Sequence, residues 1–237
     1  MPLSPGTNMT AQIAIVTGHS SGLGRCIAQM LLERGWVVVG VSRHPIRDEL
    51  FASHHHALHN ITGSVANETT VAAAFEMADT LGGATLVVNC AGQGAFGEIG
   101  SYSIADIMTA LEGNLVGLIA FSDRAIVHLR ERGGSIVNVM STASKKYRTA
   151  ESVYTAAKWG AKAYTRTLRD AIKAKKLNIR VYEIYPCGMN TNFWASAIRA
   201  GTDGKNFPEP KSIARVVISA VLSNDTAYPQ ELTFERA

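Results

Sequence analysis

The residue types and spacing of Tyr154 and Lys158 could support acid–base chemistry. They are four residues apart within residues 152–175, where the pattern predicts a helix, so both side chains would share one helix face. A free phenol has a pKa of about 10, and a neighbouring ammonium favours the phenolate and lowers that pKa. Tyr154 would then be usable as a general acid or base near neutral pH. The same spacing also occurs in surface pairs that do no chemistry.

A glycine-rich stretch near the start of the chain could bind a phosphate group. It reads Thr17-Gly18-His19-Ser20-Ser21-Gly22-Leu23-Gly24 and lies between an apolar run and a predicted helix. Glycines let the backbone approach a pyrophosphate, whose charge is stabilised by free amides and by the dipole of the helix. A tight turn without a ligand would use the same residues, but the preceding strand and following helix favour a dinucleotide site.

Short apolar runs alternate with longer helical patterns and would position these residues. The predicted strands are residues 11–17, 37–42, 85–89, 135–140, 179–184 and 231–234, and the predicted helices are residues 22–34, 104–130, 152–175 and 212–222. Runs such as Ile13-Ala14-Ile15-Val16 are apolar at successive residues, which is typical of parallel strands buried on both faces. We predict an α/β fold of the Rossmann type, a doubly wound parallel sheet of about seven strands with helices on both faces. Ligands of such sheets bind beyond the carboxyl ends of the strands.

The length and composition are those of an ordinary globular protein. The chain has 237 residues, of which 46% are hydrophobic, and shows no repeat or change in composition. We predict one domain over residues 11–237 after a flexible lead-in at residues 1–10. Apolar runs such as residues 37–39 and 85–90 are far shorter than the roughly 20 residues of a membrane span. We therefore expect no membrane helix, and the N-terminus has no secretory pattern.

Cysteines, histidines and charge exclude several other classes of function. The three cysteines are far apart, which argues against a disulfide framework and favours the cytoplasm. The net charge of +4 is spread thinly, so we expect no nucleic-acid partner. His54, His55, His56 and His59 are predicted to lie in a solvated loop, since consecutive side chains point in different directions. No metal is expected.

Several motifs occur in an order that resembles the short-chain dehydrogenase/reductase family, over essentially the whole chain. The loop has the pattern T-G-x-x-x-G-x-G, and Asn89-Cys90-Ala91-Gly92 looks like the N-N-A-G of the family. Asn114 resembles its helix asparagine, Ser141 lies thirteen residues before Tyr154, and Tyr154 to Lys158 matches Y-x-x-x-K. Pro186 to Thr191 resembles P-G-x-x-x-T, with Cys187 at the usual glycine position and Gly188 after it.

The resemblance implies a role for each matching residue. Tyr154 would be the general acid or base, Ser141 would hold the substrate oxygen, and Asn114 would hold a water that connects Lys158 to solvent. Lys158 would also bind the nicotinamide ribose. The remaining candidate cofactor-binding residues are Gly18, Ser20, Ser21, Gly22, Leu23, Ser42, Arg43, Asn60, Ile61, Asn89, Ala91, Gly92, Pro186, Gly188, Met189 and Thr191.

The end of the second predicted strand bears on which nicotinamide cofactor would bind. An acidic residue there would favour NAD, whereas this chain reads Val41-Ser42-Arg43. A guanidinium can pair with a 2′-phosphate through charge-assisted hydrogen bonds, so we predict NADP(H). A solvated loop cation is the alternative for Arg43. Asn60-Ile61 stands where the family usually has Asp-Val against the adenine.

The substrate pocket is expected from residues that follow the fourth, fifth and sixth strands. The candidates are Gln93, Phe96, Tyr147, Arg148, Phe193 and Trp194. Aromatic side chains suit a hydrophobic carbonyl compound, while Arg148 could bind a carboxylate, and the sequence leaves both open.

The resemblance implies an NADP(H)-dependent carbonyl reductase or alcohol dehydrogenase acting on a small carbonyl or alcohol substrate. A regulator that senses NADP(H) without turnover is the alternative, because related folds also host non-enzymatic functions. Small residues such as Gly113, Gly117 and Gly160 would let helices of two subunits pack closely. Since family members form dimers and tetramers through these helices, we expect a homodimer or homotetramer.

Overall fold

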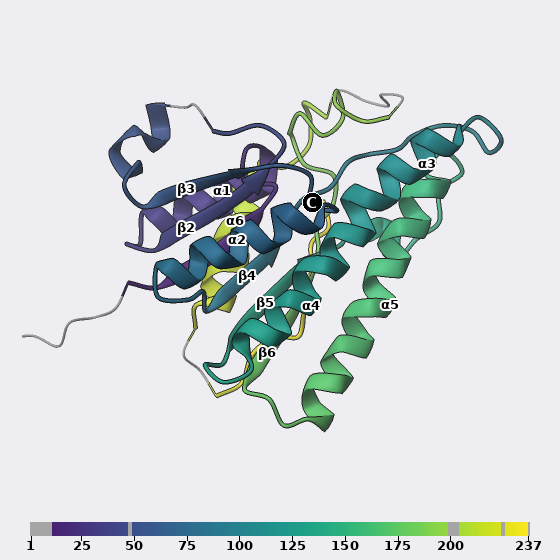
Figure 1. The fold of residues 1–237 in the computed structure, drawn as a ribbon. Coiled ribbons are helices and arrows are strands. Elements are labelled where there is room, and N and C mark those ends of the chain that lie inside the picture. Colours follow the sequence, from purple (N-terminus) through teal and green to yellow (C-terminus); the bar gives the residue numbers. More distant parts are fainter. Residues whose placement is uncertain (1–10, 47–48, 199–203, 224–225, 237) are drawn as a thin grey trace, which may run out of the picture.

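One seven-stranded sheet organises the chain (Figure 1). The computed structural model describes residues 11–46, 49–198, 204–223 and 226–236, so the predicted lead-in lies outside the described residues. The strand order is β3-β2-β1-β4-β5-β6-β7, and all neighbours pair in parallel. The predicted doubly wound α/β fold is confirmed. The strands are β1 Ile13–Thr17, β2 Val37–Ser42, β3 Leu58–Thr62, β4 Leu86–Asn89, β5 Gly134–Val139, β6 Ile179–Tyr185 and β7 Glu231–Thr233.

Helices cover both faces of the sheet. They are α1 Gly22–Leu32, α2 Glu68–Thr80, α3 Ile104–Leu111, α4 Gly117–Leu129, α5 Ser152–Ala174 and α6 Pro210–Val221. Figure 1 shows α2, α4 and α5 on the near face and α1 with α6 behind the sheet. Short 3-10 turns occupy Glu49–His54 and Thr142–Ser144.

The strand β1 is apolar throughout because its successive side chains point to opposite faces of the sheet, and both faces are covered. Ala14 and Val16 belong to the core beneath α1 and α6, and Ile13 and Ile15 belong to the core beneath α2, α4 and α5. All four are at most 2% exposed. The sheet is therefore buried on both faces, as parallel sheets require.

The helix predicted over residues 104–130 is interrupted by a π-turn, Glu112–Val116, between α3 and α4. The buried Asn114 side chain donates to the carbonyl oxygen of Ala110 at 2.9 Å, which a regular helix would bond to the Asn114 amide. The π-turn lets the side chain take that bond. Such turns are frequent at functional sites.

One prediction about the remaining segments is wrong, because His59 lies within β3 and not in a loop. The helical run Ile104–Leu129 is long and apolar enough to cross a membrane by length and composition alone. Its Phe121 and Leu129 are fully buried in the core against the sheet, which accounts for part of its apolar character.

Candidate active site

The glycine-rich loop leads from β1 into α1 at the carboxyl edge of the sheet. Gly18 and Gly22 have positive φ angles of 71° and 53°, which glycine adopts without strain. A Cβ at Gly24 would lie 2.4 Å from the Gly18 carbonyl oxygen, so the helix start could not pack there with a larger residue. Ser21 caps α1 without a side-chain hydrogen bond to its first amides. These amides lack a side-chain acceptor, as a phosphate cradle requires.

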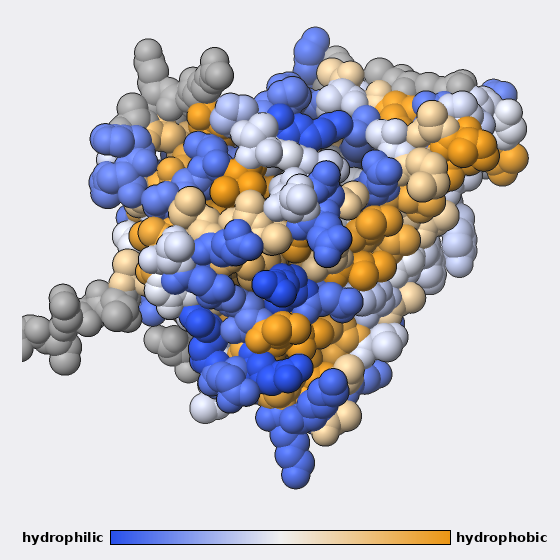
Figure 2. Space-filling model, viewed as in Figure 1, coloured by the Kyte–Doolittle hydropathy of each residue, from blue (hydrophilic) through white to orange (hydrophobic). Residues whose placement is uncertain are grey.

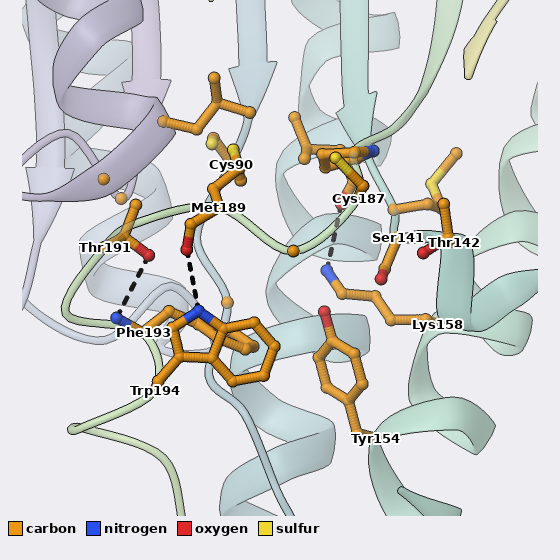
Figure 3. A pocket seen from close by; sticks show the side chains of 18 of the residues that line it. Cys90, Ser141, Thr142, Tyr154, Lys158, Cys187, Met189, Thr191, Phe193 and Trp194 are labelled. Atoms are coloured by element: carbon orange, nitrogen blue, oxygen red, sulfur yellow. Dashed lines mark hydrogen bonds between the residues drawn. The ribbon is translucent and has the colours of Figure 1, made fainter. Parts of the chain in front are cut away.

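One cavity connects this loop to the catalytic candidates. Its lining begins with Gly18, Ser21, Gly22 and Leu23 at the start of α1 and includes Arg43. It continues past the ends of β4, β5 and β6 to the residues shown in Figure 3. An elongated ligand with phosphates at one end and a reactive ring at the other would fit this cavity, and a nicotinamide dinucleotide has that shape.

Ser141, Tyr154 and Lys158 lie together in the cavity, as Figure 3 shows. Ser141 follows β5, while Tyr154 and Lys158 lie one turn apart in α5. Tyr154 is 7% exposed and Lys158 is 4% exposed. The three side chains predicted to carry the chemistry therefore meet at one place, shielded from solvent.

The protonation of this pair differs from the expectation. Burial raises the pKa of the Tyr154 phenol, and a hydrogen bond with Ser141 opposes that shift. Burial also lowers the pKa of Lys158 to about 8. The Lys158 Nζ donates to the Val139 carbonyl oxygen at 3.1 Å and lies 5.8 Å from the centre of the Tyr154 ring. The pKa of the phenol therefore shifts in the direction opposite to the expected one, and desolvation is the largest cause.

Asn114 positions the loop after β4 by both ends of its amide. Its Oδ1 accepts from the Gln93 backbone N–H at 3.3 Å, and its Nδ2 donates to the Gln93 carbonyl oxygen at 2.7 Å. A Cβ at Gly92 would lie 2.9 Å from the Asn114 Oδ1. Asn114 thus adjoins the cavity, although its side chain does not line it.

Three residues predicted to contact the cofactor have side chains that bond within the protein. The Ser42 hydroxyl donates to the His44 carbonyl oxygen. The Asn60 side chain is hydrogen-bonded to the Nε2 of the fully buried His19 at 2.6 Å. The Asn89 amide donates to Ser122 at 3.0 Å and to Asn138 at 2.8 Å.

Aromatic side chains form the substrate side of the cavity. Phe96 stacks on Trp194 with ring centres 5.3 Å apart, and Phe193 meets Tyr154 edge to face at 5.7 Å. The structure does not bring the fourth predicted aromatic residue, Tyr147, into this group. Tyr147 is 80% exposed, stacks on Trp159 and is not among the residues that line the cavity.

Arg148 lines the cavity but is already paired. Its Nη1 donates to the Glu151 Oε1 at 3.0 Å, and the Glu151 side chain is 11% exposed. A substrate carboxylate that approached Arg148 would be repelled by this buried carboxylate. Sequence reasoning missed Glu151, although its place three residues before Tyr154 was a usable signal.

The segment after β6 accommodates the displaced glycine without strain. Cys187 is not among the described non-glycine residues with positive φ. A Cβ at Gly188 would lie 3.0 Å from the Phe207 ring and 3.2 Å from the Trp194 ring, so the glycine allows these rings to approach the backbone. Burial raises the pKa of the Cys187 thiol, which makes it a poor nucleophile.

The cavity brings together most of the predicted site. It is lined by the predicted residues Gly18, Ser21, Gly22, Leu23, Arg43, Gly92, Phe96, Ser141, Arg148, Tyr154, Lys158, Pro186, Gly188, Met189, Thr191, Phe193 and Trp194. The predicted residues outside its lining are Ser20, Ser42, Asn60, Ile61, Asn89, Ala91, Gln93, Asn114 and Tyr147. Lining residues that were not predicted are Cys90, Val139, Met140, Thr142, Glu151, Cys187 and Ser196.

Comparison with known proteins agrees with this arrangement. The family model described as short chain dehydrogenase matches residues 12–200. The chain is 29% identical over 219 residues to carbonyl reductase family member 4 of Danio rerio, covering 88% of this chain and 90% of that protein. It is 30% identical over 230 residues to ketoacyl reductase HetN of a Nostoc species, covering 93% and 78% respectively.

Solved structures show the same fold at lower identity. An alcohol dehydrogenase from Thermococcus sibiricus, complexed with 5-hydroxy-NADP, matches with a TM-score of 0.83 at 23% identity, covering 94% of this chain and 96% of that chain. A serine dehydrogenase complexed with NADP+ matches with a TM-score of 0.81 at 23% identity, covering 94% of each chain.

Proposed function

The chain belongs to the short-chain dehydrogenase family of oxidoreductases, and from this premise we propose that it is an NADP(H)-dependent carbonyl reductase or alcohol dehydrogenase. The observation that carries the proposal is the single cavity that joins the amides at the start of α1 to Ser141, Tyr154 and Lys158. When bound, the cofactor supplies or accepts the hydride.

Tyr154 supplies the proton in the proposed reduction. Because burial raises its pKa, the phenol stays protonated at neutral pH and can donate to the carbonyl oxygen of a substrate. Ser141 donates a hydrogen bond to the same oxygen and holds it near the phenol. Lys158, with a pKa of about 8, carries a proton close to Tyr154 at neutral pH.

Arg43 supports the preference for NADP(H). It is exposed, lines the end of the cavity near the start of α1, and follows a strand that ends without an acidic residue. A guanidinium there can bind a 2′-phosphate with charge-assisted hydrogen bonds. Two structural relatives were crystallised with NADP-type cofactors, which agrees with this preference.

The substrate that fits best is an uncharged carbonyl compound with an apolar body. Phe96, Phe193 and Trp194 offer apolar surface beside Tyr154. The pairing of Arg148 with Glu151 disfavours a carboxylate, which the sequence alone left open. The names of the curated relatives, a carbonyl reductase and a ketoacyl reductase, agree with carbonyl reduction.

Two chains are proposed to associate through α3, α4 and α5. Along α3, the π-turn and α4, four apolar residues are between 41% and 76% exposed: Ile104, Met108, Val116 and Val127. Figure 2 shows apolar side chains gathered over this part of the surface. A two-fold dimer or a tetramer would bury them.

The test is NADPH oxidation, followed by absorbance, against a panel of apolar ketones, aldehydes, diketones and 3-oxo acids. The wild-type protein should turn over apolar uncharged members best and should work poorly with NADH. Tyr154→Phe should lose turnover and keep NADPH binding. Tight NADPH binding without turnover on any member would instead favour the sensing regulator.

A further inference from the structure

Gln93 connects the cofactor side of the cavity to the loop that covers the substrate side. We propose that Gln93 transmits the presence of the cofactor 2′-phosphate from Arg43 to the substrate loop, defined as residues 192–198. The same carbonyl compound would then bind more tightly beside NADPH than beside NADH. The inference rests on the proposed function, because it takes Arg43 as the phosphate-binding residue.

The backbone of Gln93 is held in place. Asn114, which is 1% exposed, contacts both the N–H and the carbonyl oxygen of Gln93. The neighbouring Gly94 carbonyl oxygen accepts from the Ile198 N–H at 2.9 Å. The Gln93 side chain is therefore the part of this residue that can respond to a change at the cofactor end.

The Gln93 side chain bridges two groups that do not otherwise meet. The Arg43 Nη1 donates to the Gln93 Oε1 at 3.4 Å, and the Gln93 Nε2 donates to the Ser196 carbonyl oxygen at 3.3 Å. A carboxamide accepts at one end and donates at the other, which a bridge from a guanidinium to a carbonyl requires. A carboxylate lacks the donor, and an aliphatic side chain lacks both groups.

The substrate loop carries aromatic residues of the substrate site. Phe193 and Trp194 lie within it, and the Trp194 Nε1 donates to the Met189 carbonyl oxygen at 2.8 Å. At the far end of the loop, the Phe96 N–H donates to the Ile198 carbonyl oxygen at 2.9 Å. The hydrogen bond from Gln93 to Ser196 lies between the attachments at Trp194 and Ile198 and holds the segment between these two residues.

A bound phosphate would restrain this bridge from the Arg43 side. Arg43 is exposed, and a guanidinium has several N–H donors, so it can bind a phosphate while it still donates to Gln93. Fixing the guanidinium holds the Gln93 amide with its donor toward Ser196. Coupling of this kind is reciprocal, so the substrate would also tighten NADPH binding.

The kinetic test compares carbonyl KM values with saturating NADPH and saturating NADH. In the wild-type protein the KM with NADH should be at least about fivefold higher, the lower end of typical coupling. In Gln93→Leu the two values should agree within about twofold. Ser196→Ala is the matched control and should keep the wild-type ratio, because Gln93 bonds to the backbone of Ser196.

A second readout needs no turnover. Hydrogen exchange of the Ser196 and Ile198 amides is measured with saturating 2′,5′-ADP and with saturating 5′-AMP. The former, which carries the 2′-phosphate, should slow exchange more in the wild-type protein and not in Gln93→Leu.

The outcomes separate this inference from the proposed function. Tighter binding of 2′,5′-ADP than of 5′-AMP, with no difference in loop exchange or with a difference that survives in Gln93→Leu, overturns the role of Gln93 alone. Equal binding of the two nucleotides overturns both the assignment of Arg43 and the inference built on it.

Discussion

The ammonium of Lys158 donates to the Val139 carbonyl oxygen at 3.1 Å, while its nitrogen lies 5.8 Å from the centre of the Tyr154 ring. Lys158 is thus fixed to the end of β5 and stands beside the phenol without bonding to it. Both side chains are buried, and burial moves their pKa values in opposite directions, upward for Tyr154 and downward for Lys158. The site holds a protonated phenol next to an amine that titrates near neutral pH.

Lys158→Met should abolish turnover and yet stabilise the fold near neutral pH. The pKa of Lys158 is about 8 in the folded protein against an ordinary value of 10.5, so between these values the unfolded state binds more protons. The contribution of Lys158 to the free energy of unfolding therefore rises with pH across this window. Below about pH 8 the folded protein bears the full cost of burying the charged ammonium. At pH 7 the variant should gain up to about 3 kcal/mol in free energy of unfolding, less about 1 kcal/mol for the lost hydrogen bond.

Urea denaturation of both proteins at several pH values measures this difference. The gain should shrink as the pH rises toward about 10.5. A variant that is less stable than the wild-type protein at pH 7 would show that the burial penalty is smaller than the bonds that Lys158 makes.

Arg43→Ser should weaken NADPH binding selectively. Loss of charge-assisted hydrogen bonds to a 2′-phosphate costs about 1.5–3 kcal/mol, so the KM for NADPH should rise by roughly ten- to a hundredfold. The KM for NADH should change little, since that cofactor lacks the phosphate. Arg34→Ala, at the other end of α1, is the control and should affect neither value. An equal rise for both cofactors in Arg43→Ser would remove the basis for NADP(H) preference.

Trp194→Ala should raise the KM for apolar carbonyl compounds by at least about tenfold, because a large aromatic surface beside the substrate is lost. Tyr147→Ala is the matched comparison, since Tyr147 is 80% exposed outside the cavity. Steady-state kinetics with one apolar substrate measures the KM of both variants and shows whether only Trp194 contributes to substrate binding. Comparable losses in both would place Tyr147 at the substrate after all.

Glu183→Ala should destabilise the fold strongly. Glu183 is fully buried in β6 and pairs with Arg169 at 2.7 Å and with Arg166 at 3.4 Å. Removing this carboxylate leaves the buried Tyr185 hydroxyl without its acceptor, which costs about 1–3 kcal/mol, and takes the ion-pair partner from two partly exposed arginines. Glu231→Ala breaks a more exposed contact of Arg166 and should cost less than about 1 kcal/mol. Thermal unfolding of the two variants at one pH separates these values.

Light scattering at micromolar concentration should give a mass at least twice the 25.4 kDa of one chain. Val127→Glu, at a residue that is 60% exposed on α4, should reduce that mass if this surface lies between subunits. Its far-ultraviolet circular dichroism should stay unchanged, which controls for unfolding. A monomeric wild-type protein would contradict the proposed association.

The strongest sequence signals were those in which local structure alone sets the geometry. The four-residue spacing in a helix is enough to place Tyr154 and Lys158 on one face, and the structure shows this arrangement. The tight turn likewise follows from the glycines at residues 18, 22 and 24. The strand β3 was harder to find because Leu58–Thr62 lies at the sheet edge and has only two apolar residues, Leu58 and Ile61. The helix α2 was missed despite its cap, in which the Asn67 side chain accepts from two backbone amides.

Other features depend on where a side chain points after the chain has folded. The position of Tyr147 after the fifth predicted strand suggested the pocket, but its ring stacks on Trp159. The direction of the Tyr154 pKa shift depends on burial and on the acceptor chosen by Lys158, neither of which follows from spacing. The pairing of Arg148 with Glu151 likewise needs the three-dimensional arrangement.

The loops around the substrate are joined by their backbones. Ala95 pairs with Ile198, Gly97 pairs with Glu151, and the bonds that join them involve only N–H and carbonyl groups. Such bonds do not depend on side-chain identity, whereas the cavity wall is made of the side chains of Phe96, Phe193 and Trp194. Substitutions at Phe96 and Phe193 can thus change which compounds enter while the backbone bonds between the loops persist. This separation makes the site a favourable starting point for directed evolution toward new substrates.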